Sequence, residues 1–402
     1  MKQAIVLSGG GSRGAYQIGV WKALIKLRIK YDIVTGTSVG ALNGALMIQN
    51  KFREAYNLWS KMNFNVIFDE KIKNDSSSKE GKKEIFKLYA KNITLDGGMY
   101  ASNLYDVINK MVDEDYIRKS EIDFGLVTVK YPSLKSVSLT KKDIPNGELK
   151  NYLIASSACF PAFQKKKINN EYYIDGGYYD NLPLNLACSM GAEKIIAVDL
   201  DAVGVKRKLK YENVEIKMIS SNHNLGSFLD FDNELSNNNI FYGYTDTLKS
   251  YGKLVGKFYT FKKHEFKKLH RRYDDKFMKV FKNTVEKNKF ALSLKSRNYK
   301  RILKNDKSIL EEILEYLGEI YGIDDKRIYR LTNYNKVLLK KIKSININEI
   351  NKTLKYIKLL EKDRLIKYFS LLIMQGKNKE LDKFIPIFSK EILCSIYISL
   401  IS

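Results

Sequence analysis

The stretch "YDIVTGTSVGALNGALMIQN", residues 31–50, decides how the first half of this chain folds. It starts as a short apolar strand-like run and continues as a helical pattern. Between the two, Gly36 and Gly40 flank Ser38 in the pattern G-x-S-x-G. Small flanking residues allow a sharp strand-to-helix turn with the serine at its tip, and the helix dipole favours an incipient alkoxide there. We therefore predict that Ser38 is a nucleophile, with a plain turn serine as the alternative.

A glycine-rich turn precedes this stretch, in "LSGGGSRGAYQIGV". Gly9, Gly11 and Gly14 fit G-x-G-x-x-G, the spacing of a dinucleotide-binding turn. That interpretation needs an acidic residue at the end of the following strand, whereas Asp32 precedes the strand. The turn also lacks the Gly-Lys-Ser/Thr ending of a P-loop. A nucleotide site is therefore the weaker interpretation of these glycines.

The same glycines suit an oxyanion hole. Acyl transfer needs hydrogen-bond donors directed at the negative oxygen of a tetrahedral intermediate. Consecutive Gly9, Gly10 and Gly11 can direct their backbone N–H groups into one concavity. Arg13 would hold this loop in shape or add positive potential, unless it is an ordinary surface arginine.

A serine nucleophile needs a base within hydrogen-bond reach. The chain has three histidines, His223, His264 and His270, and residues 1–222 contain none. His264 and His270 lie outside the α/β pattern, so only His223 could approach Ser38. A Ser-His-Asp triad is therefore poorly supported.

Asp175 is the stronger candidate for the base, in "YYIDGGYYDNLPLNLA". It ends a strand-like run, and Gly176 and Gly177 let the chain turn immediately afterwards. A carboxylate placed in this way can take the proton of a serine directly, although it could also merely satisfy a tight turn. Three further carboxylates compete less well: Asp180 lies beyond this turn, and Asp199 and Asp201 follow a strand-like run but lack an adjacent glycine pair.

Strand-like runs alternate with helical patterns over the first 200 residues, as in "QAIVLS", "DFGLVTVKY" and "EKIIAVDL". This alternation predicts an α/β fold with a mostly parallel central sheet flanked by helices. From about residue 265 the chain reads as Lys-, Ile- and Leu-rich helices. We expect an α/β catalytic domain over residues 1–262 and a Lys-rich helical C-terminal domain of unknown role over residues 263–402.

The net charge of +25 is concentrated in the second part of the chain. Residues 251–402 hold 36 Lys and Arg against 17 Asp and Glu, and residues 251–300 alone hold 16 against 4. Such a block attracts an anionic membrane or nucleic acid, unless it only reflects the lysine-rich composition of the whole chain.

The cysteines and the lengths of the apolar runs limit which other classes of protein this sequence could represent. Cys159, Cys188 and Cys394 lie far apart without metal-ligand spacing, and their odd number argues against a disulfide framework. We see no signal peptide and no run of about 18 apolar residues. The expectation is a cytoplasmic protein that needs neither a metal nor a cofactor.

Three motifs in order, "GGGSRG", "GTSVG" and "DGG", carry a resemblance to the patatin-like phospholipase family over about residues 3–202. "ASSACFPAF" and "DGGYYDNLP", with Asn181 and Pro183, add to it, and Ser8 before the glycines is closer to bacterial members. The resemblance implies an α/β sandwich and a Ser-Asp dyad without a metal. By position, Ser38 would be the nucleophile and Asp175 the base, and the oxyanion region would comprise Gly9, Gly10, Gly11 and Arg13.

This resemblance predicts a lipid acyl hydrolase that acts on a phospholipid or another acyl-ester lipid. A non-lipid esterase, an effector that needs an activator, and a binding protein that acts through the basic C-terminal region are the alternatives. Because the implied substrate lies in a membrane, peripheral contact of residues 251–300 with anionic membranes ranks above nucleic-acid binding.

Overall fold

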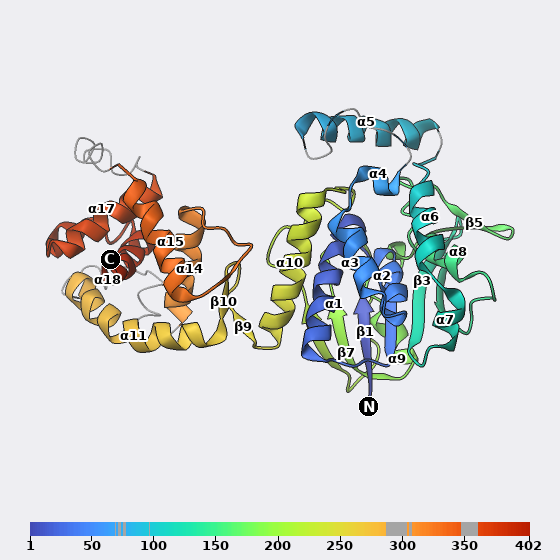
Figure 1. Cartoon of the computed structure of the whole chain (residues 1–402), viewed down its shortest axis with the longest axis horizontal. Coiled ribbons are helices and arrows are strands. Elements are labelled where there is room, and N and C mark those ends of the chain that lie inside the picture. Colours follow the sequence, from blue (N-terminus) through green and yellow to red (C-terminus); the bar gives the residue numbers. More distant parts are fainter. Residues whose placement is uncertain are drawn as a thin grey trace. The chain divides into compact units, whose positions relative to one another are not determined.

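A computed structural model of the chain describes residues 1–68, 70, 74, 78–95, 97–286, 304, 308–346 and 361–402. These residues form two compact units, Met1–Ser250 and Tyr251–Ser402, which are described separately below (Figure 1). The division lies 12 residues before the boundary expected at residue 262, because a short β-hairpin that precedes residue 262 belongs to the second unit.

An eight-stranded sheet forms the centre of the first unit. Its strands are β1 (Lys2–Leu7), β2 (Ile33–Thr37), β3 (Asp123–Tyr131), β4 (Ser136–Thr140), β5 (Lys166–Ile168), β6 (Glu171–Asp175), β7 (Ala192–Val198) and β8 (Glu215–Ile219). They follow the order β5-β6-β3-β2-β1-β7-β8, and β4 also pairs with β3. Strands β3, β2, β1, β7 and β8 are parallel to their neighbours in this run, whereas β4, β5 and β6 are antiparallel additions. The predicted mostly parallel α/β sheet is confirmed.

Helices cover both faces of this sheet. They are α1 (Ala15–Leu27), α2 (Val39–Ile48), α3 (Phe52–Ser60), α4 (Phe64–Ile67), α5 (Lys79–Leu95), α6 (Ser102–Met111), α7 (Glu114–Lys119), α8 (Leu149–Ser156), α9 (Leu184–Ser189) and α10 (Asn233–Ser250), with 3-10 turns η1 (Gly11–Gly14) and η2 (Gly176–Tyr178). Ala4 and Val6 of β1 pack with Ala187 of α9, whereas Leu7 is directed towards α2. Since neighbouring residues of a strand face opposite sides, β1 is buried on both faces and reads as a continuous apolar run.

The glycines around Ser38 are required by this packing. A Cβ on Gly36 would lie 2.4 Å from the carbonyl carbon of Gly40. A Cβ on Gly40 would lie 2.3 Å from the carbonyl oxygen of Leu7. Strand β2 therefore turns into α2 at a point where α2 touches the end of β1, which explains why the turn carries G-x-S-x-G.

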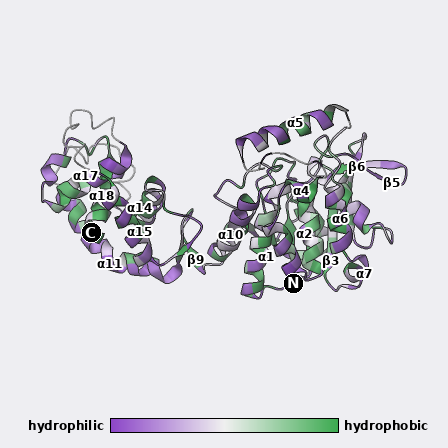
Figure 2. Cartoon of the chain, turned by 45° about the horizontal axis from the view of Figure 1, so that its top comes forward, coloured by the Kyte–Doolittle hydropathy of each residue, from purple (hydrophilic) through white to green (hydrophobic). Residues whose placement is uncertain are grey.

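The second unit is mainly helical and has its own core. It contains α11 (Lys263–Phe281), the π-helical turn η3 (Lys282–Glu286), α14 (Ser308–Ile320), α15 (Leu331–Ser344), α17 (Lys362–Met374), the 3-10 turn η5 (Asn378–Leu381) and α18 (Ser389–Ile401). Buried aromatic residues fill the core, among them Phe261, Tyr334, Phe369 and Tyr397. The predicted helical C-terminal region is confirmed, and the polar residues of α11 stand out in Figure 2.

A small sheet in this unit was not predicted from the sequence. It joins β9 (Leu254–Val255), β10 (Thr260–Lys262) and β11 (Ile328–Tyr329). Two or three residues are too few to show an alternating pattern, so the sequence carries no period-2 signal there. Of the helices in the described part of the chain, α18 included, none is long and apolar enough to cross a membrane.

We predict that Gly40→Ala lowers the free energy of unfolding by about 2–4 kcal/mol, because the new methyl group meets the backbone of β1. Gly44→Ala on the same helix is the matched control. Its Cβ would meet side chains and no backbone, with Val34 at 2.9 Å, Phe124 at 3.5 Å and Leu7 at 3.7 Å, and alanine gains helix propensity. Denaturant unfolding of both variants measures the difference, and equal losses would show that the contact with Leu7 is not the constraint.

Candidate active site

Ser38 occupies the turn between β2 and α2 in a conformation that L-residues rarely adopt. Its φ is 56° and its ψ is −128°, and its side chain is almost fully buried. The Ser38 backbone N–H donates to Ser156 Oγ at 2.9 Å, and Ser156 Oγ donates to the carbonyl oxygen of Val127 at 2.7 Å. Thus Ser156 ties the strained turn to the neighbouring strand β3.

Strand register brings Asp175 to the same place. Gly36 and Thr37 of β2 lie beside Leu126 and Val127 of β3, and Thr128 lies beside Asp175 of β6. Because β6 is antiparallel to β3, its last residue reaches the sheet at the level where β2 ends. The Ser38 side chain lies close enough to Asp175 to stabilise the charged carboxylate, which lowers the pKa of that carboxyl. Two residues that are 137 positions apart are therefore direct partners.

Burial raises the pKa of Asp175 from 3.8 to about 6. The hydrogen bonds from the Ser38 hydroxyl and the Gly177 N–H act in the opposite direction, because they stabilise the charged form. The Gly177 bond is 2.7 Å long. The carboxylate is thus largely ionised at neutral pH and is more basic than an exposed aspartate.

The glycine turn lies beside Ser38. A Cβ on Gly9 would come within 3.1 Å of Ser38 Cβ and within 2.4 Å of Asn181 Oδ1. The Gly9 N–H already donates to the Asn181 carbonyl oxygen at 3.1 Å. Gly10 and Gly11, by contrast, line a cavity that also contains Ser38. Of the three predicted oxyanion glycines, Gly10 and Gly11 have the better-placed backbone.

Arg13 holds the glycine turn from outside this cavity. Its Nε donates to the carbonyl oxygen of Gly226 at 2.8 Å, and its Nη1 donates to those of Leu200 and Asp201 at 3.1 and 2.6 Å. The guanidinium is not among the groups that line the cavity. Of the two roles predicted for Arg13, the geometry favours holding the loop in shape.

A cavity of about 600 Å³ opens at Ser38 and Asp175. Its wall is mainly apolar and extends along α2, α3, α4 and α6, with contributions from Leu42, Leu46, Trp59, Ile67, Leu104 and Ile108. Gly10, Gly11, Asp175 and Asn181 also line this cavity. The arrangement brings a hydroxyl, a carboxylate and backbone donors into the wall of one mainly apolar chamber.

The competing carboxylates lie elsewhere. Asp180 is buried, and its Oδ1 accepts long hydrogen bonds from the N–H groups of Leu182 and Arg207. Asp199 pairs with Lys206 at 2.6 Å, and Asp201 is exposed. None of the three lines the cavity. Their positions agree with structural roles.

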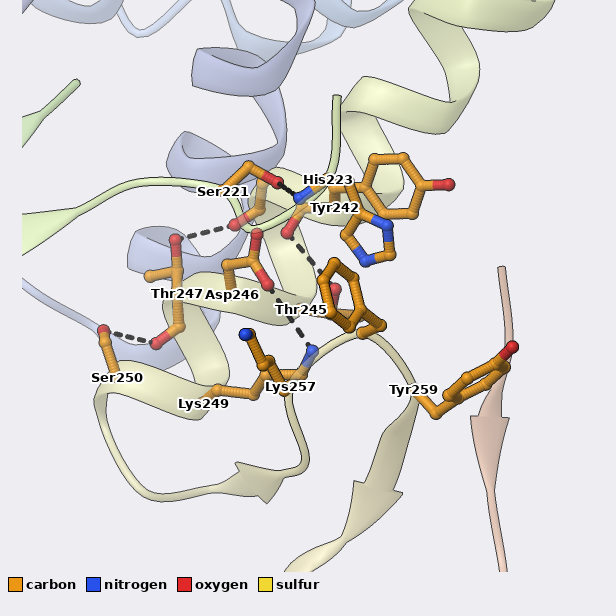
Figure 3. Close-up of polar contacts among 12 residues, drawn as sticks. Ser221, His223, Tyr242, Thr245, Asp246, Thr247, Lys249, Ser250, Lys257 and Tyr259 are labelled. Carbon is orange, nitrogen blue, oxygen red and sulfur yellow. Dashed lines mark hydrogen bonds and ion pairs between the residues drawn. The ribbon is translucent and has the colours of Figure 1, made fainter. Parts of the chain in front are cut away.

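The histidines do not line the cavity in the described structure. The His223 ring stacks on Tyr242 at 3.8 Å between ring centroids (Figure 3). Nearby, Asp246 accepts a hydrogen bond from Tyr16 at 3.1 Å and faces Lys249 at 3.5 Å. His264 pairs with Glu265 in the second unit, and the side chain of His270 lies outside the described residues.

Two polar residues of the site received no role from sequence reasoning alone. Ser156 lies in "ASSACFPAF", and Asn181 lies in "DGGYYDNLP". Asn181 binds Gly9 through both its carbonyl oxygen and its side-chain amide, and its N–H donates to Val205 at 2.6 Å. The two quoted segments carried the signal, but a side chain that supports backbone atoms has no pattern of its own in one sequence.

Within the described residues, no group of three or more His, Cys, Asp or Glu side chains could hold a metal ion. The three cysteines are free thiols, and Cys159 lines the cavity.

Residues 5–188 match the model of the family described as patatin-like phospholipase. This part of the chain is a domain of that family, as the three motifs predicted. Patatin-like phospholipase domain-containing protein 6 of Homo sapiens is 28% identical over 206 residues, which are 49% of this chain and 13% of that protein. The lysophospholipase NTE1 of Meyerozyma guilliermondii is 27% identical over 214 residues, 52% of this chain and 13% of that protein. The matched segment is therefore only a small part of each relative's own length.

Among solved structures, VipD from Legionella pneumophila aligns with a TM-score of 0.41 and 14% identity, over 100% of this chain and 91% of that one.

The raised pKa of Asp175 makes a prediction about stability. The Asp175 carboxyl has a pKa of 3.8 in the unfolded chain and a pKa of about 6 in the folded protein. Ionisation of this carboxyl in the folded protein therefore lowers the free energy of unfolding. This loss is fully present above pH 6 and absent below pH 3.8. Asp175→Asn should therefore raise the free energy of unfolding by about 1–3 kcal/mol at pH 8, and much less at pH 4.

Denaturant unfolding at the two pH values checks this prediction. Asp143→Asn is the control, since hydrogen bonds from Thr140 lower the pKa of that exposed carboxyl, and its removal should not stabilise the chain. An Asp175→Asn variant that is no more stable than wild type at pH 8 would contradict the assigned burial cost.

Proposed function

We propose that this chain is a lipid acyl hydrolase that cleaves carboxylic esters with Ser38 as nucleophile and Asp175 as base. The observation that carries the proposal is that Ser38 and the buried carboxylate of Asp175 line one mainly apolar cavity, where the Ser38 side chain stabilises the charged carboxylate. Membership of residues 5–188 in the patatin-like phospholipase family supports the same chemistry.

In the first step, Asp175 takes the proton of Ser38 while Ser38 Oγ attacks the ester carbonyl carbon. The tetrahedral intermediate collapses, the bond to the alcohol oxygen breaks, and the proton on Asp175 passes to the departing alcohol. Asp175 then takes a proton from water, whose oxygen attacks the acyl-serine. The bond to Ser38 Oγ breaks, the proton returns to Ser38, and the fatty acid leaves.

The backbone N–H groups of Gly10 and Gly11 would stabilise the negative oxygen of both intermediates, with Gly9 and Arg13 holding the turn that presents them. The Ser38 N–H is already bonded to Ser156 and is therefore a poor donor for this purpose. Preformed donors matter because they need no reorganisation during the reaction.

The chamber suits a fatty acyl chain. Its apolar wall begins at Ser38 and reaches Leu46, eight residues along α2 and about 12 Å away by helical rise. An apolar cavity of about 600 Å³ gives an acyl chain an environment free of water, while the headgroup stays at the mouth. A lysophospholipid or phospholipid therefore fits better than a small polar ester, and one relative is named a lysophospholipase.

Residues 1–262 would form the catalytic domain in this proposal, and residues 263–402 a Lys-rich helical domain. Contact of residues 251–300 with anionic membranes stays a prediction. Lys267 and Lys268 of α11 are exposed there, as an electrostatic contact requires. Residues 287–300 lie outside the described residues. The cytoplasmic location also remains a prediction, and a requirement for an activator remains an alternative.

Replacing either partner of the proposed dyad should abolish hydrolysis. Ser38→Ala and Asp175→Asn are each expected to lower kcat/KM for a short-chain nitrophenyl ester by at least about 10³-fold while the fold persists. In the wild type, kcat/KM should fall about tenfold per pH unit below an apparent pKa of about 6, because the base is then protonated. Circular dichroism controls for folding. Full activity in either variant would overturn the dyad.

Filling the chamber should change acyl-length preference. Leu46→Trp, at 5% exposure in the wild type, is expected to lower kcat/KM for a long-chain lysophospholipid at least about tenfold while a short-chain nitrophenyl ester is still hydrolysed. Leu46→Phe enlarges the side chain less and replaces the tryptophan variant if that variant folds poorly. Leu46→Met conserves the side-chain volume and is the control. Equal losses for both substrates would exclude the chamber as the acyl site.

A further inference from the structure

The segment between β7 and β8 carries an apolar tip followed by a basic run. We call residues 201–211, "DAVGVKRKLKY", the mouth loop. Val203 is 97% exposed and Val205 is 43% exposed. Single exposed apolar residues are normal on protein surfaces, so exposure alone assigns nothing to this loop.

The position of the tip is the second observation. Val203, Gly204 and Val205 line the cavity that contains Ser38. The Val205 N–H donates to the Gly177 carbonyl oxygen at 2.9 Å, and the Val205 carbonyl oxygen accepts from Asn181 at 2.6 Å. The exposed tip is thus bonded to the segment that follows Asp175, and it stands at the mouth of the apolar chamber.

Positive charge follows the tip immediately. Lys206 pairs with Asp199, and the Arg207 guanidinium lies 4.1 Å from the ring centre of Tyr179. Lys208 and Lys210 come next and are exposed. Asn185 of α9 bonds the backbone of both, at 3.1 Å to the Lys208 carbonyl oxygen and at 2.9 Å to the Lys210 N–H. The lysines therefore project from a backbone that is held in place.

We propose that the mouth loop is the surface by which this chain docks on an anionic phospholipid membrane. A bilayer interface takes up an apolar tip and at the same time offers phosphates and anionic headgroups to nearby lysines. Docking in this way opens the chamber onto the lipid, so that an acyl chain reaches Ser38 without crossing water. The proposal rests on the proposed function only for the identity of the lipid substrate, and it assigns membrane contact to residues outside 251–300.

Vesicle binding tests the electrostatic part. Ser38→Ala serves as the background, so that no substrate is consumed, and phosphatidylcholine vesicles are compared with vesicles that also contain phosphatidylserine. Lys208→Glu with Lys210→Glu should weaken binding to the anionic vesicles by roughly 30-fold, since each lysine near such a surface contributes about 1 kcal/mol. Lys119→Glu with Lys142→Glu is the matched control, because these exposed lysines flank the start of β3, away from the mouth.

Val203→Ser tests the apolar part. It should weaken binding to neutral and anionic vesicles by a similar factor, roughly fivefold, because the contribution of a buried side chain does not depend on headgroup charge. Unchanged binding by both the lysine pair and Val203→Ser would overturn the proposal. Equal binding of the background protein to the two vesicle types would also overturn it.

The competing surface is α11, tested with Lys267→Glu and Lys268→Glu. Loss of vesicle binding by this pair alone, with the mouth-loop pair unaffected, would exclude the mouth loop as the docking surface. In the enzyme that retains Ser38, Lys208→Glu with Lys210→Glu should leave hydrolysis of a short-chain nitrophenyl ester unchanged and should reduce hydrolysis of vesicle lipid. A wild type without esterase activity but with loop-dependent vesicle binding would refute the proposed function and leave the docking surface standing.

Discussion

The backbone of Ser38 is the constraint on which the first unit depends. Its φ of 56° and ψ of −128° cost on the order of 1–3 kcal/mol, and such a conformation persists only where the surroundings enforce it. Here they do so by contact and by hydrogen bonding. Gly40 touches the carbonyl of Leu7, and Ser156 binds the Ser38 N–H. The strained backbone therefore belongs to Ser38, whose side chain lines the cavity.

Asp175 shows the corresponding conflict between stability and chemistry. Burial raises its pKa to about 6, which makes the ionised carboxylate costly and also makes it a better base at neutral pH. Hydrogen bonds from Ser38 and Gly177 limit the cost without removing it. The same desolvation underlies both the predicted effect on stability and the predicted pH dependence of the rate.

The site and the mouth loop share one short segment of chain. Residues 175–181 hold the carboxylate, bind the glycine turn through Asn181, and bond the tip at Val205. A displacement of this segment would move the Asp175 carboxylate, the glycine turn and the mouth loop together. Four hydrogen bonds connect the proposed docking surface to the candidate site, two between Asn181 and Gly9 and one each from Val205 to Gly177 and from Asn181 to Val205.

The sequence by itself determined the elements that local patterns encode. The alternation of apolar runs predicted the parallel sheet, and G-x-S-x-G predicted the turn at Ser38, because each needs only neighbouring residues. The three motifs also predicted the family. The sequence could rank Asp175 above Asp180, because Asp175 ends a strand-like run and precedes a glycine pair, whereas Asp180 lies beyond that turn.

Only the tertiary structure decided which of these residues meet, and the reason is physical. The pairing of Asp175 with Ser38 depends on the register of β6 against β3, which no local pattern specifies. The loss of Gly9 as a free donor, the outward position of Arg13 and the apolar chamber arise from contacts between distant segments. Motif spacing along the chain identified the candidate reactive side chains. The packing of β1, β2, β3 and β6 determined the positions of those side chains relative to one another.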